Sequence, residues 1–386
     1  MAATDGPDGR IQFGYDSLGR VVSQTRAIIA HGESIGSAHS VTWGTTFSWG
    51  GKSLASRLSQ GATERIRLES DYDAMGRLRW LGYALEGAST ADVLWEVLAL
   101  TPAGGSLLER TGNGLVTGVG RDVVDQMTSL SIRKVSGVGS AWDRDTHAVD
   151  VGVREDLEDG FAGAGPSDTR YGLSAIVRNG YGAVRWVEDE GAGLRSSVFE
   201  YDQGTRLTKA SVAGYGFEYG YDRLQNLTKR VTAVVPGGAM APELQSGTYS
   251  FFSGTRRASG ISDGLTSTSF AYDAGGRTTS IVDGAGTTVM AWDAFDRKRV
   301  VDQPGSGQTA HRYGADGERA TTTWASGEVE RYFGGGLTER DGRLELHVGL
   351  GGPRQVARLN VPWAVGGSLG AVEQSVVYLH QGFGHG

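Results

Sequence analysis

The sequence contains no cysteine and only 8 prolines among its 386 residues. Disulfide bonds, thiolate metal sites and a cysteine nucleophile are therefore excluded. The N-terminal residues, MAATDGPDGR, are polar and lack the apolar segment of a secretory signal peptide. No stretch approaches the ~18 apolar residues of a membrane-spanning helix, so we expect no membrane segment.

The charge balance is unremarkable, with 37 basic and 44 acidic residues and a net charge of -7. A nucleic-acid-binding protein needs a clustered basic surface, so we expect no nucleic-acid partner. Glycine is abundant, with 62 residues, which is well above the usual ~7%. The 9 Trp, 14 Tyr and 11 Phe can still bury a sizeable core, which argues against a disordered chain.

A short motif repeats along the chain. Residues 15–20 read Tyr-Asp-Ser-Leu-Gly-Arg, and closely similar copies occupy 72–77 and 272–277. Weaker copies begin at 201, 221, 292 and 313. The starts at 201 and 221 are 20 residues apart, and those at 272, 292 and 313 are 20 and 21 residues apart. The residues that we assign to the repeat turns are Tyr15, Asp16, Gly19, Arg20, Tyr72, Asp73, Gly76, Arg77, Tyr201, Asp202, Tyr221, Asp222, Tyr272, Asp273, Gly276, Arg277, Trp292, Asp293, Tyr313, Asp316 and Gly317.

A finer period of ten residues separates Asp263, Asp273, Asp283 and Asp293. Each unit of ten is interpreted as a strand of about six residues and a four-residue turn, so two units form a β-hairpin. Aspartate at the first turn position and glycine at the fourth are typical of a type I turn.

Two further patterns concern local structure. Asn113-Gly114 and Asn179-Gly180 predict type I′ hairpin turns. The apolar residues 93–100 fit a buried strand or a buried helical turn, and the repeats on either side favour the strand. The sequence therefore predicts an all-β fold.

A ribbon of about 19 hairpins would contain about 38 strands and would be ~180 Å long at ~4.8 Å per strand. Open twisted sheets rarely exceed about 10 strands without curling. We therefore expect the hairpin ribbon to coil into a complete or partial hollow shell.

The repeat rhythm breaks twice. We expect residues 1–386 to form a single segment with irregular insertions near 138–170 and 231–247, the first acidic and solvated and neither with a long helix. A Ca²⁺ site in the acidic insertion is an alternative to a solvated loop, although no EF-hand spacing is present.

Candidate catalytic motifs are weak. Gly366-Gly367-Ser368-Leu369-Gly370 matches the hydrolase pattern G-x-S-x-G, but no aspartate follows it. Gly51-Lys52-Ser53 resembles the end of a phosphate-binding loop, but Thr46 stands where that loop needs glycine. We assign no catalytic, cofactor or metal site, with a metal role for His380 and His385 left as an alternative.

Two tryptophans allow a binding role. Trp43 and Trp49 lie six residues apart in a segment that predicts a strand. We expect both to pack on a sheet face, with a carbohydrate platform as the alternative.

The repeat units resemble the YD repeats of the Rhs family, which includes Rhs polymorphic toxins, cocoon subunits of insecticidal toxin complexes and teneurins. The resemblance covers about residues 10–386. Residues 94–97, leading to Gly112-Asn113-Gly114, and the triplet Tyr378-Leu379-His380 resemble further Rhs segments. The resemblance implies a β-ribbon that spirals into a shell around a C-terminal toxin, or that supports adhesion domains in teneurins.

The chain departs from the family after Tyr378-Leu379-His380, and it has no Asp-Pro motif. We therefore expect the Rhs core and the C-terminal toxin domain to be absent.

The expected role is a non-enzymatic shell segment whose partners are the rest of the shell and an enclosed toxin or other cargo. We expect export or cell-surface association by a route without a cleavable signal peptide. The alternatives are an adhesion module that binds glycans or a partner cell, and an enzyme with Ser368 as nucleophile.

Overall fold

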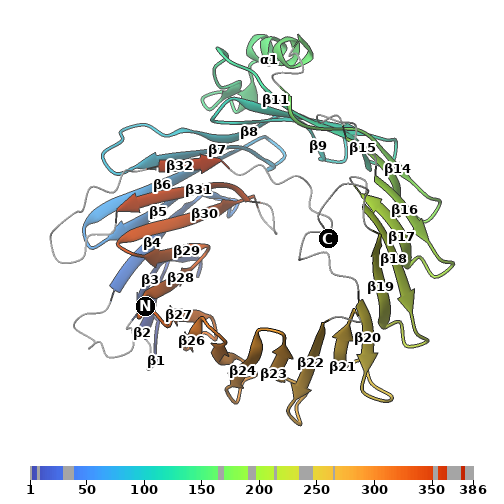
Figure 1. Cartoon of the computed structure of the whole chain (residues 1–386). Helices are drawn as coiled ribbons and strands as arrows, with labels where there is room; N and C mark the ends of the chain where they lie inside the picture. Colours follow the sequence, from blue (N-terminus) through green and yellow to red (C-terminus); the bar gives the residue numbers. More distant parts are fainter. Residues whose placement is uncertain are drawn as a thin grey trace. The chain divides into compact units, whose positions relative to one another are not determined.

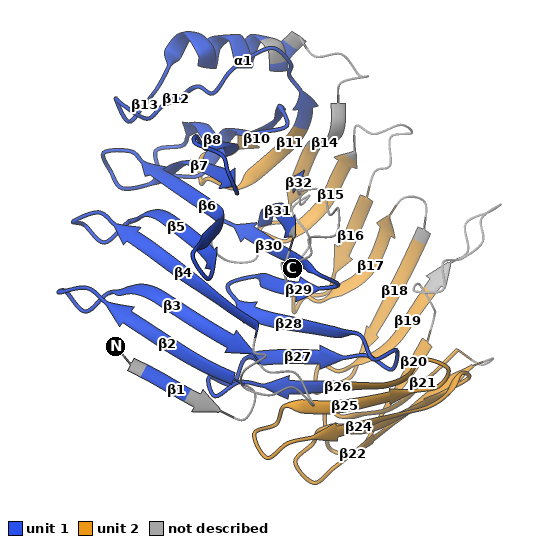
Figure 2. Ribbon diagram, turned by 90° about the vertical axis from the view of Figure 1, so that its left-hand side faces the viewer, with its two compact units in different colours: residues 1–118, 132–169, 311–386 blue, residues 119–131, 170–310 orange. Residues whose placement is uncertain are grey.

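The computed structural model describes residues 2–6, 9–28, 39–163, 169–189, 197–212, 215–233, 247–263, 266–350, 355–362 and 375–378. These residues form an almost entirely antiparallel β-fold, as the sequence predicted, with one helix. No helix among them is long and apolar enough to cross a membrane. The chain divides into two compact units, one of residues 1–118, 132–169 and 311–386, the other of residues 119–131 and 170–310 (Figure 2).

The first unit contains a run of hairpins in which each strand pairs with the next. Its strands are β1 (Ala2–Gly6), β2 (Gly9–Tyr15), β3 (Val21–Ile28), β4 (His39–Phe47), β5 (Ser53–Gln60), β6 (Thr63–Tyr72), β7 (Leu78–Leu85), β8 (Asp92–Leu100) and β9 (Ser106–Thr111). Strands β10 (Leu115–Arg121) and β11 (Met127–Lys134) each cross the division between the units. Residues 93–100 therefore lie in a strand, as expected.

A second layer of strands covers one face of this sheet (Figure 1). It consists of β27 (Arg319–Thr323), β28 (Val329–Gly334), β29 (Leu337–Arg340), β30 (Arg343–Gly349), β31 (Gln355–Pro362) and β32 (Ser375–Tyr378). The core lies between the layers, where Leu58 and Ile66 of the first sheet and Leu344 and Leu359 of the second are fully buried. Unit 1 is thus a two-layer sandwich.

Ion pairs join the two layers at the edge of this core. The Nη1 atom of Arg26 lies 2.9 Å from Oδ2 of Asp316. Glu339 pairs with Arg331 at 2.7 Å and lies 3.5 Å from Nδ1 of His39. Burial alone would raise the pKa of Glu339, but hydrogen bonds from His39 and Arg331 lower it.

The acidic insertion differs from the expected solvated loop. It forms a short hairpin, β12 (Trp142–Asp143) with β13 (Ala148–Val149), followed by helix α1 (Val151–Gly163). Asp150 caps the helix, because its carboxylate accepts the backbone N–H of Val153 at 3.1 Å. Leu157 is fully buried against a second apolar cluster, and Val153 and Phe161 pack there on the same face. The four-residue spacing of these three residues was the helical signal in the sequence.

The second unit is a single run of consecutively paired antiparallel strands. Its strands are β14 (Thr169–Arg178), β15 (Val184–Asp189), β16 (Ser197–Tyr201), β17 (Leu207–Val212), β18 (Tyr215–Tyr221), β19 (Leu227–Ala233), β20 (Gly247–Phe251), β21 (Ala258–Ser262), β22 (Ser267–Tyr272), β23 (Thr278–Asp283), β24 (Gly286–Trp292) and β25 (Lys298–Gln303). Strand β26 (Gly307–Tyr313) crosses the division between units. Most of the expected insertion near 231–247 lies outside the described residues.

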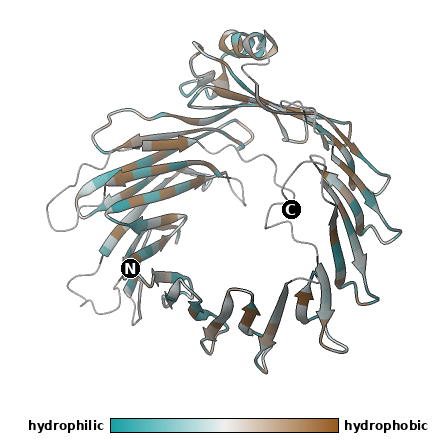
Figure 3. Ribbon diagram, viewed as in Figure 1, coloured by the Kyte–Doolittle hydropathy of each residue, from teal (hydrophilic) through white to brown (hydrophobic). Residues whose placement is uncertain are grey.

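Hydrophobic and hydrophilic residues alternate along these strands (Figure 3). In β22 and β24, each side chain of one face is half-buried and each neighbour is exposed. The ten-residue period of Asp263, Asp273, Asp283 and Asp293 matches the ends of successive strands here. Alternation with period two and turns at that interval are the reasons that this part of the chain forms hairpins.

Candidate functional site

One aspartate closes each full repeat turn. The Oδ1 atom of Asp16 accepts the backbone N–H groups of Leu18 and Arg20, both at 2.9 Å. Its Oδ2 atom accepts the Nε–H of Arg20 at 2.6 Å. The N–H of Gly19 donates to the Asp16 carbonyl at 3.1 Å, and the N–H of Asp16 donates to the Arg20 carbonyl at 3.0 Å. We call this arrangement, a type I turn whose first aspartate also bonds the side chain four residues on, the aspartate clamp.

The clamp recurs in both units. Further pairs, with Oδ2–Nε distances of 2.6–2.8 Å, are Asp73–Arg77, Asp202–Arg206, Asp273–Arg277 and Asp293–Arg297. In the copy at Asp222 the partner is Asn226, whose Nδ2 donates at 2.8 Å. The repeat motif did not identify Arg206, Asn226 or Arg297, because these copies lack the glycine before the partner. The spacing of four residues from the aspartate was the signal available.

The aromatic residue of each repeat ends its strand and reaches the preceding turn. Tyr272 donates its hydroxyl to the Ala258 carbonyl at 2.9 Å, fourteen residues earlier. Trp292 makes the same contact through Nε1, to the Thr278 carbonyl at 2.8 Å. Both tyrosine and tryptophan can make this contact because each has a hydrogen-bond donor on its ring system. Equivalent bonds are made by Tyr72, Tyr201 and Tyr221.

In some of the clamps the arginine also reaches the following turn. Arg277 donates from Nη1 to the Asp293 carbonyl at 3.0 Å, and Arg20 donates to the Ser48 carbonyl at 2.9 Å. The turn at Asp273 is therefore bonded within itself and to the turns on both sides. Among the aromatic residues of the repeats, Tyr15 is unusually exposed, with 47% of its surface accessible to solvent.

The clamp favours the charged carboxylate. The backbone N–H of the residue four positions on is the largest cause of the lowered pKa of Asp16, Asp202 and Asp273. Burial alone would raise the pKa of Asp73 and Asp293, but the same N–H group and the guanidinium outweigh it. These carboxylates are already bonded in the folded chain, which suits a structural role.

The fourth turn position has a left-handed backbone. Gly19, Gly76 and Gly276 adopt φ values of 75°, 72° and 88°. The weaker copies place Thr205 and Asp296 there at 62° and 61°, which is strained for a side chain with a Cβ atom.

The type I′ prediction for the two Asn-Gly pairs is wrong. The backbone N–H of Gly182 donates to the carbonyl of Asn179 at 2.9 Å, and that of Gly114 donates to the carbonyl of Thr111 at 2.9 Å. Positive φ occurs only at Gly114 and Gly182 in these turns, whereas type I′ requires it at both central residues. The asparagine at 179 instead occupies the aspartate position of the repeat turn.

The last copy of the repeat is rearranged. Gly314 occupies the place of the aspartate after Tyr313, and its N–H donates to the Glu318 carbonyl at 2.8 Å. Asp316 lies two positions later and pairs with Arg26 of the other layer. Gly317 keeps the left-handed position, with φ of 82°. This turn fastens the two layers of unit 1 instead of a neighbouring hairpin.

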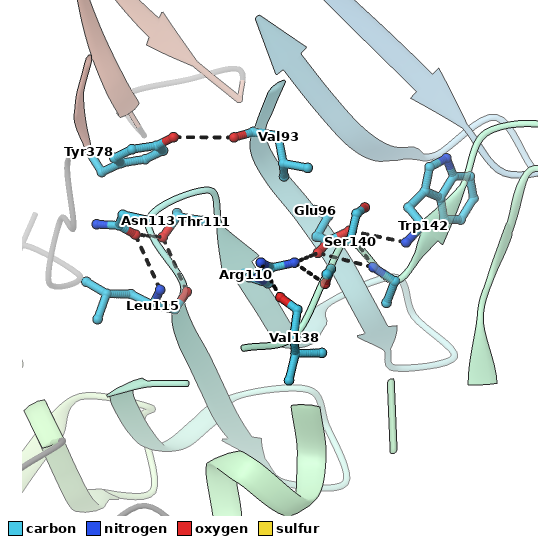
Figure 4. A network of polar contacts seen from close by, with 12 residues as sticks. Val93, Glu96, Arg110, Thr111, Asn113, Leu115, Val138, Ser140, Trp142 and Tyr378 are labelled. Atoms are coloured by element: carbon cyan, nitrogen blue, oxygen red, sulfur yellow. Dashed lines mark hydrogen bonds and ion pairs between the residues drawn. The ribbon is translucent and has the colours of Figure 1, made fainter. Parts of the chain in front are cut away.

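A buried ion pair anchors the insertion to β8 and β9 (Figure 4). Glu96 is fully buried, and its Oε1 atom accepts Nη1–H of Arg110 at 3.0 Å. Its Oε2 atom accepts the hydroxyl of Ser140 at 2.7 Å and the backbone N–H of Trp142 at 3.2 Å. Arg110 also donates to the Val138 carbonyl at 2.8 Å. Glu96 belongs to the Rhs-like residues 94–97, but no sequence pattern indicated its pairing with Arg110 or Ser140.

Two segments that are distant in the sequence meet beside this ion pair (Figure 4). The hydroxyl of Tyr378 donates to the Val93 carbonyl at 3.3 Å. A Cβ atom at Gly112 would lie 2.4 Å from that hydroxyl and 1.9 Å from the Val93 carbonyl oxygen, so only glycine fits. Burial raises the pKa of Tyr378, which keeps the hydroxyl protonated as a donor. Both Rhs-like motifs therefore contribute to one junction.

The structure gives no support to the alternative catalytic and metal sites, and it separates the two tryptophans. Ser368, His380 and His385 lie outside the described residues. Within the described part of the chain, no group of three histidine, aspartate or glutamate side chains is arranged to hold a metal. Trp43 packs against the core of unit 1, as expected. Trp49 lies at a turn and is 95% exposed, which contradicts the expected sheet-face packing.

No protein-family model and no curated protein matches this sequence. Solved structures match in fold. The crystal structure of TcdB2-TccC3 aligns with a TM-score of 0.69 and 17% identity over 97% of this chain and 19% of that chain. The Photorhabdus luminescens Tc holotoxin pore aligns with a TM-score of 0.61 and 17% identity over 92% of this chain and 17% of that one. This chain spans less than a fifth of the length of these chains.

We expect Asp73→Ala to lower the free energy of unfolding by about 1–2 kcal/mol, because the variant loses bonds to two backbone N–H groups and a guanidinium. Urea denaturation measures the change. Asp302→Ala, at an exposed position of β25, is the matched control and should be nearly neutral. Equal effects of the two substitutions would contradict a role for the clamp in stability.

Backbone strain predicts opposite outcomes at two equivalent turn positions. Thr205→Gly should raise the free energy of unfolding by about 0.5–1 kcal/mol, since glycine adopts positive φ without strain. Gly19→Thr should lower it by about 1–2 kcal/mol, because a Cβ there meets nothing within 4 Å and only the backbone cost remains. Thermal unfolding of both variants tests this, and a stabilising Gly19→Thr would refute it.

The clamps also predict a pH dependence. Each carboxylate has a lower pKa in the folded chain than in the unfolded chain, so its contribution is present above the unfolded value of ~4. It is lost as the pH falls through the folded pKa. The urea midpoint should therefore fall steeply below about pH 4, and less steeply in the double variant Asp273→Asn, Asp293→Asn. Identical pH profiles would disprove this.

Glu96→Ala should lower the free energy of unfolding by about 3–5 kcal/mol, since it leaves Arg110 buried without its carboxylate. Ser140→Ala removes a single bond to the same carboxylate and should cost only about 1 kcal/mol. Chemical denaturation of both variants separates the ion pair from the rest of the network. A loss in Glu96→Ala no larger than in Ser140→Ala would contradict the anchoring role.

Proposed function

We propose that this chain is a wall segment of an Rhs/YD-repeat shell that encloses a toxin or other cargo polypeptide. Its contribution would be containment without catalysis. The observation that carries this proposal is the chain of aspartate clamps. Each clamp carboxylate is bonded within its own turn. At Asp273, the side chains of Arg277 and Tyr272 also bond that turn to its neighbours. Such a lattice makes a stiff, continuous sheet, which is what a wall requires.

The fold comparisons support the same role. A similar fold occurs in chains of the TcdB2-TccC3 complex and the Tc holotoxin pore. Because this chain spans about a fifth of those chains, the remainder of a shell would have to come from further polypeptide. The proposed partners are therefore the rest of the shell and the enclosed cargo, and the proposed location is outside the producing cell or at its surface.

Containment can be tested by expressing the chain with the polypeptide encoded by the next open reading frame. We expect the two to purify together, the cargo to resist protease, and electron microscopy to show density that is absent from the chain alone. With the double variant Asp273→Ala, Asp293→Ala, the protease should digest the cargo faster than it does with the unaltered chain. A partner that binds but is digested as quickly as the free polypeptide would refute containment.

Exposed aromatic side chains at turn tips favour a second candidate, an adhesion surface for glycans or a partner cell. Trp49, Tyr181 and Phe295 are 95%, 82% and 77% exposed. Aromatic rings are common contacts in recognition surfaces. Binding to a glycan array that is lost in Trp49→Ala would support adhesion. If the unaltered chain binds no glycan, the shell remains the favoured proposal.

A further inference from the structure

The hairpins of β20–β25 have two chemically different faces. Residues directly opposite each other in an antiparallel pair lie on the same face, as Phe270 does with Ile281 and Met290 does with Val301. We call this side, which carries the repeat tyrosines, the Tyr face. Its described apolar residues in these strands are Tyr249, Phe251, Ile261, Phe270, Tyr272, Ile281, Met290, Trp292 and Val301.

The opposite face of the same strands carries smaller side chains and no aromatic residue, with serine, alanine or valine at most of its paired positions. Val282 lies opposite Ser269, and Val289 lies opposite both Ser280 and Asp302. Val282 and Val289 are 42% and 50% exposed. Adjacent residues such as Ile281 and Val282 therefore lie on opposite faces of one sheet.

The equivalent face is covered in unit 1. Tyr72 belongs to the repeat there, and Ile66 and Leu68 lie on the same side of β6. Ile66 is fully buried beneath the second layer, where it belongs to the same core as Leu344 and Leu346 of β30. The same repeat pattern thus makes a face that accepts a second β-sheet.

That face lacks a second layer among the described residues of unit 2. In β20–β25 no described hydrophobic side chain is buried, and the apolar positions are only partly covered. The middle of the face carries no charge, since its paired positions are Thr268, Phe270, Ile281, Thr288, Met290 and Val301. An uncharged aromatic and aliphatic surface favours an apolar partner.

We propose that the Tyr face of β20–β25 is an interaction surface for a β-hairpin of a partner polypeptide that presents aliphatic side chains on one face. The hairpin would pack on unit 2 as β30 and β31 pack on unit 1, where Leu344, Leu346 and Leu359 supply the aliphatic face. Sheets that stack in this way interdigitate side chains about 10 Å apart. The surface does not depend on the containment of cargo, and it would exist equally in an adhesion module.

The probe is a fluorescent cyclic peptide with the sequence of residues 343–362, which includes β30 and β31. Its binding to the full chain is measured by fluorescence anisotropy. We expect saturable binding that weakens at least tenfold in the double variant Ile281→Glu, Met290→Glu. The matched control Val282→Glu, Val289→Glu alters the neighbouring residues on the other face and should change binding less than twofold.

Folding of each variant is checked by circular dichroism and melting temperature. If the glutamate pair on the Tyr face unfolds the chain, Ile281→Thr with Met290→Thr replaces it and should still weaken binding. No binding to the unaltered chain, or equal weakening in the control, would overturn the proposal. Equal binding of a linear peptide of the same composition in scrambled order would also overturn it, because the surface would then recognise any apolar chain.

Discussion

The carboxylate of the repeat turn is the constraint on which the rest of the structure depends. In the clamp at Asp273, one aspartate fixes the turn and orients Arg277, which reaches the next turn. The aromatic residue before the aspartate bonds back to the previous turn. Register between neighbouring hairpins is therefore set at the turns, which leaves both faces of the sheet free to carry different side chains. A weakly specified strand register would otherwise be prone to slip.

This division of roles explains why one repeat can serve two environments. In unit 1 the Tyr face lies in the core, and residues such as Ile66 are fully buried. In β20–β25 the same side of the repeat is only partly covered. The turns have the same geometry in both, as Asp73 and Asp273 show. The bonds of the aspartate and its partner within the turn are therefore the same whether the face is covered or not.

The sequence was sufficient for the hairpins and insufficient for the long-range contacts. Period-two alternation and the spacing of Asp273 and Asp293 predicted strands and turns, since both are local. The burial of Glu96 against Ser140 and the meeting of Gly112 with Tyr378 were not predictable, because partners 44 or more residues apart leave no periodic signal. Helix α1 was missed because a single acidic segment hid the spacing of Val153, Leu157 and Phe161.

The distribution of charge bears most directly on function. Acidic residues repeated at fixed intervals can be mistaken for a catalytic or metal-binding array. Here the clamp carboxylates each accept bonds from their own backbone and, except at Asp222, from an arginine. A general base or a metal ligand needs lone pairs that remain available to a substrate or an ion, and such bonds occupy them. The repeated aspartates of the clamps therefore act on the chain itself, by holding its turns in shape.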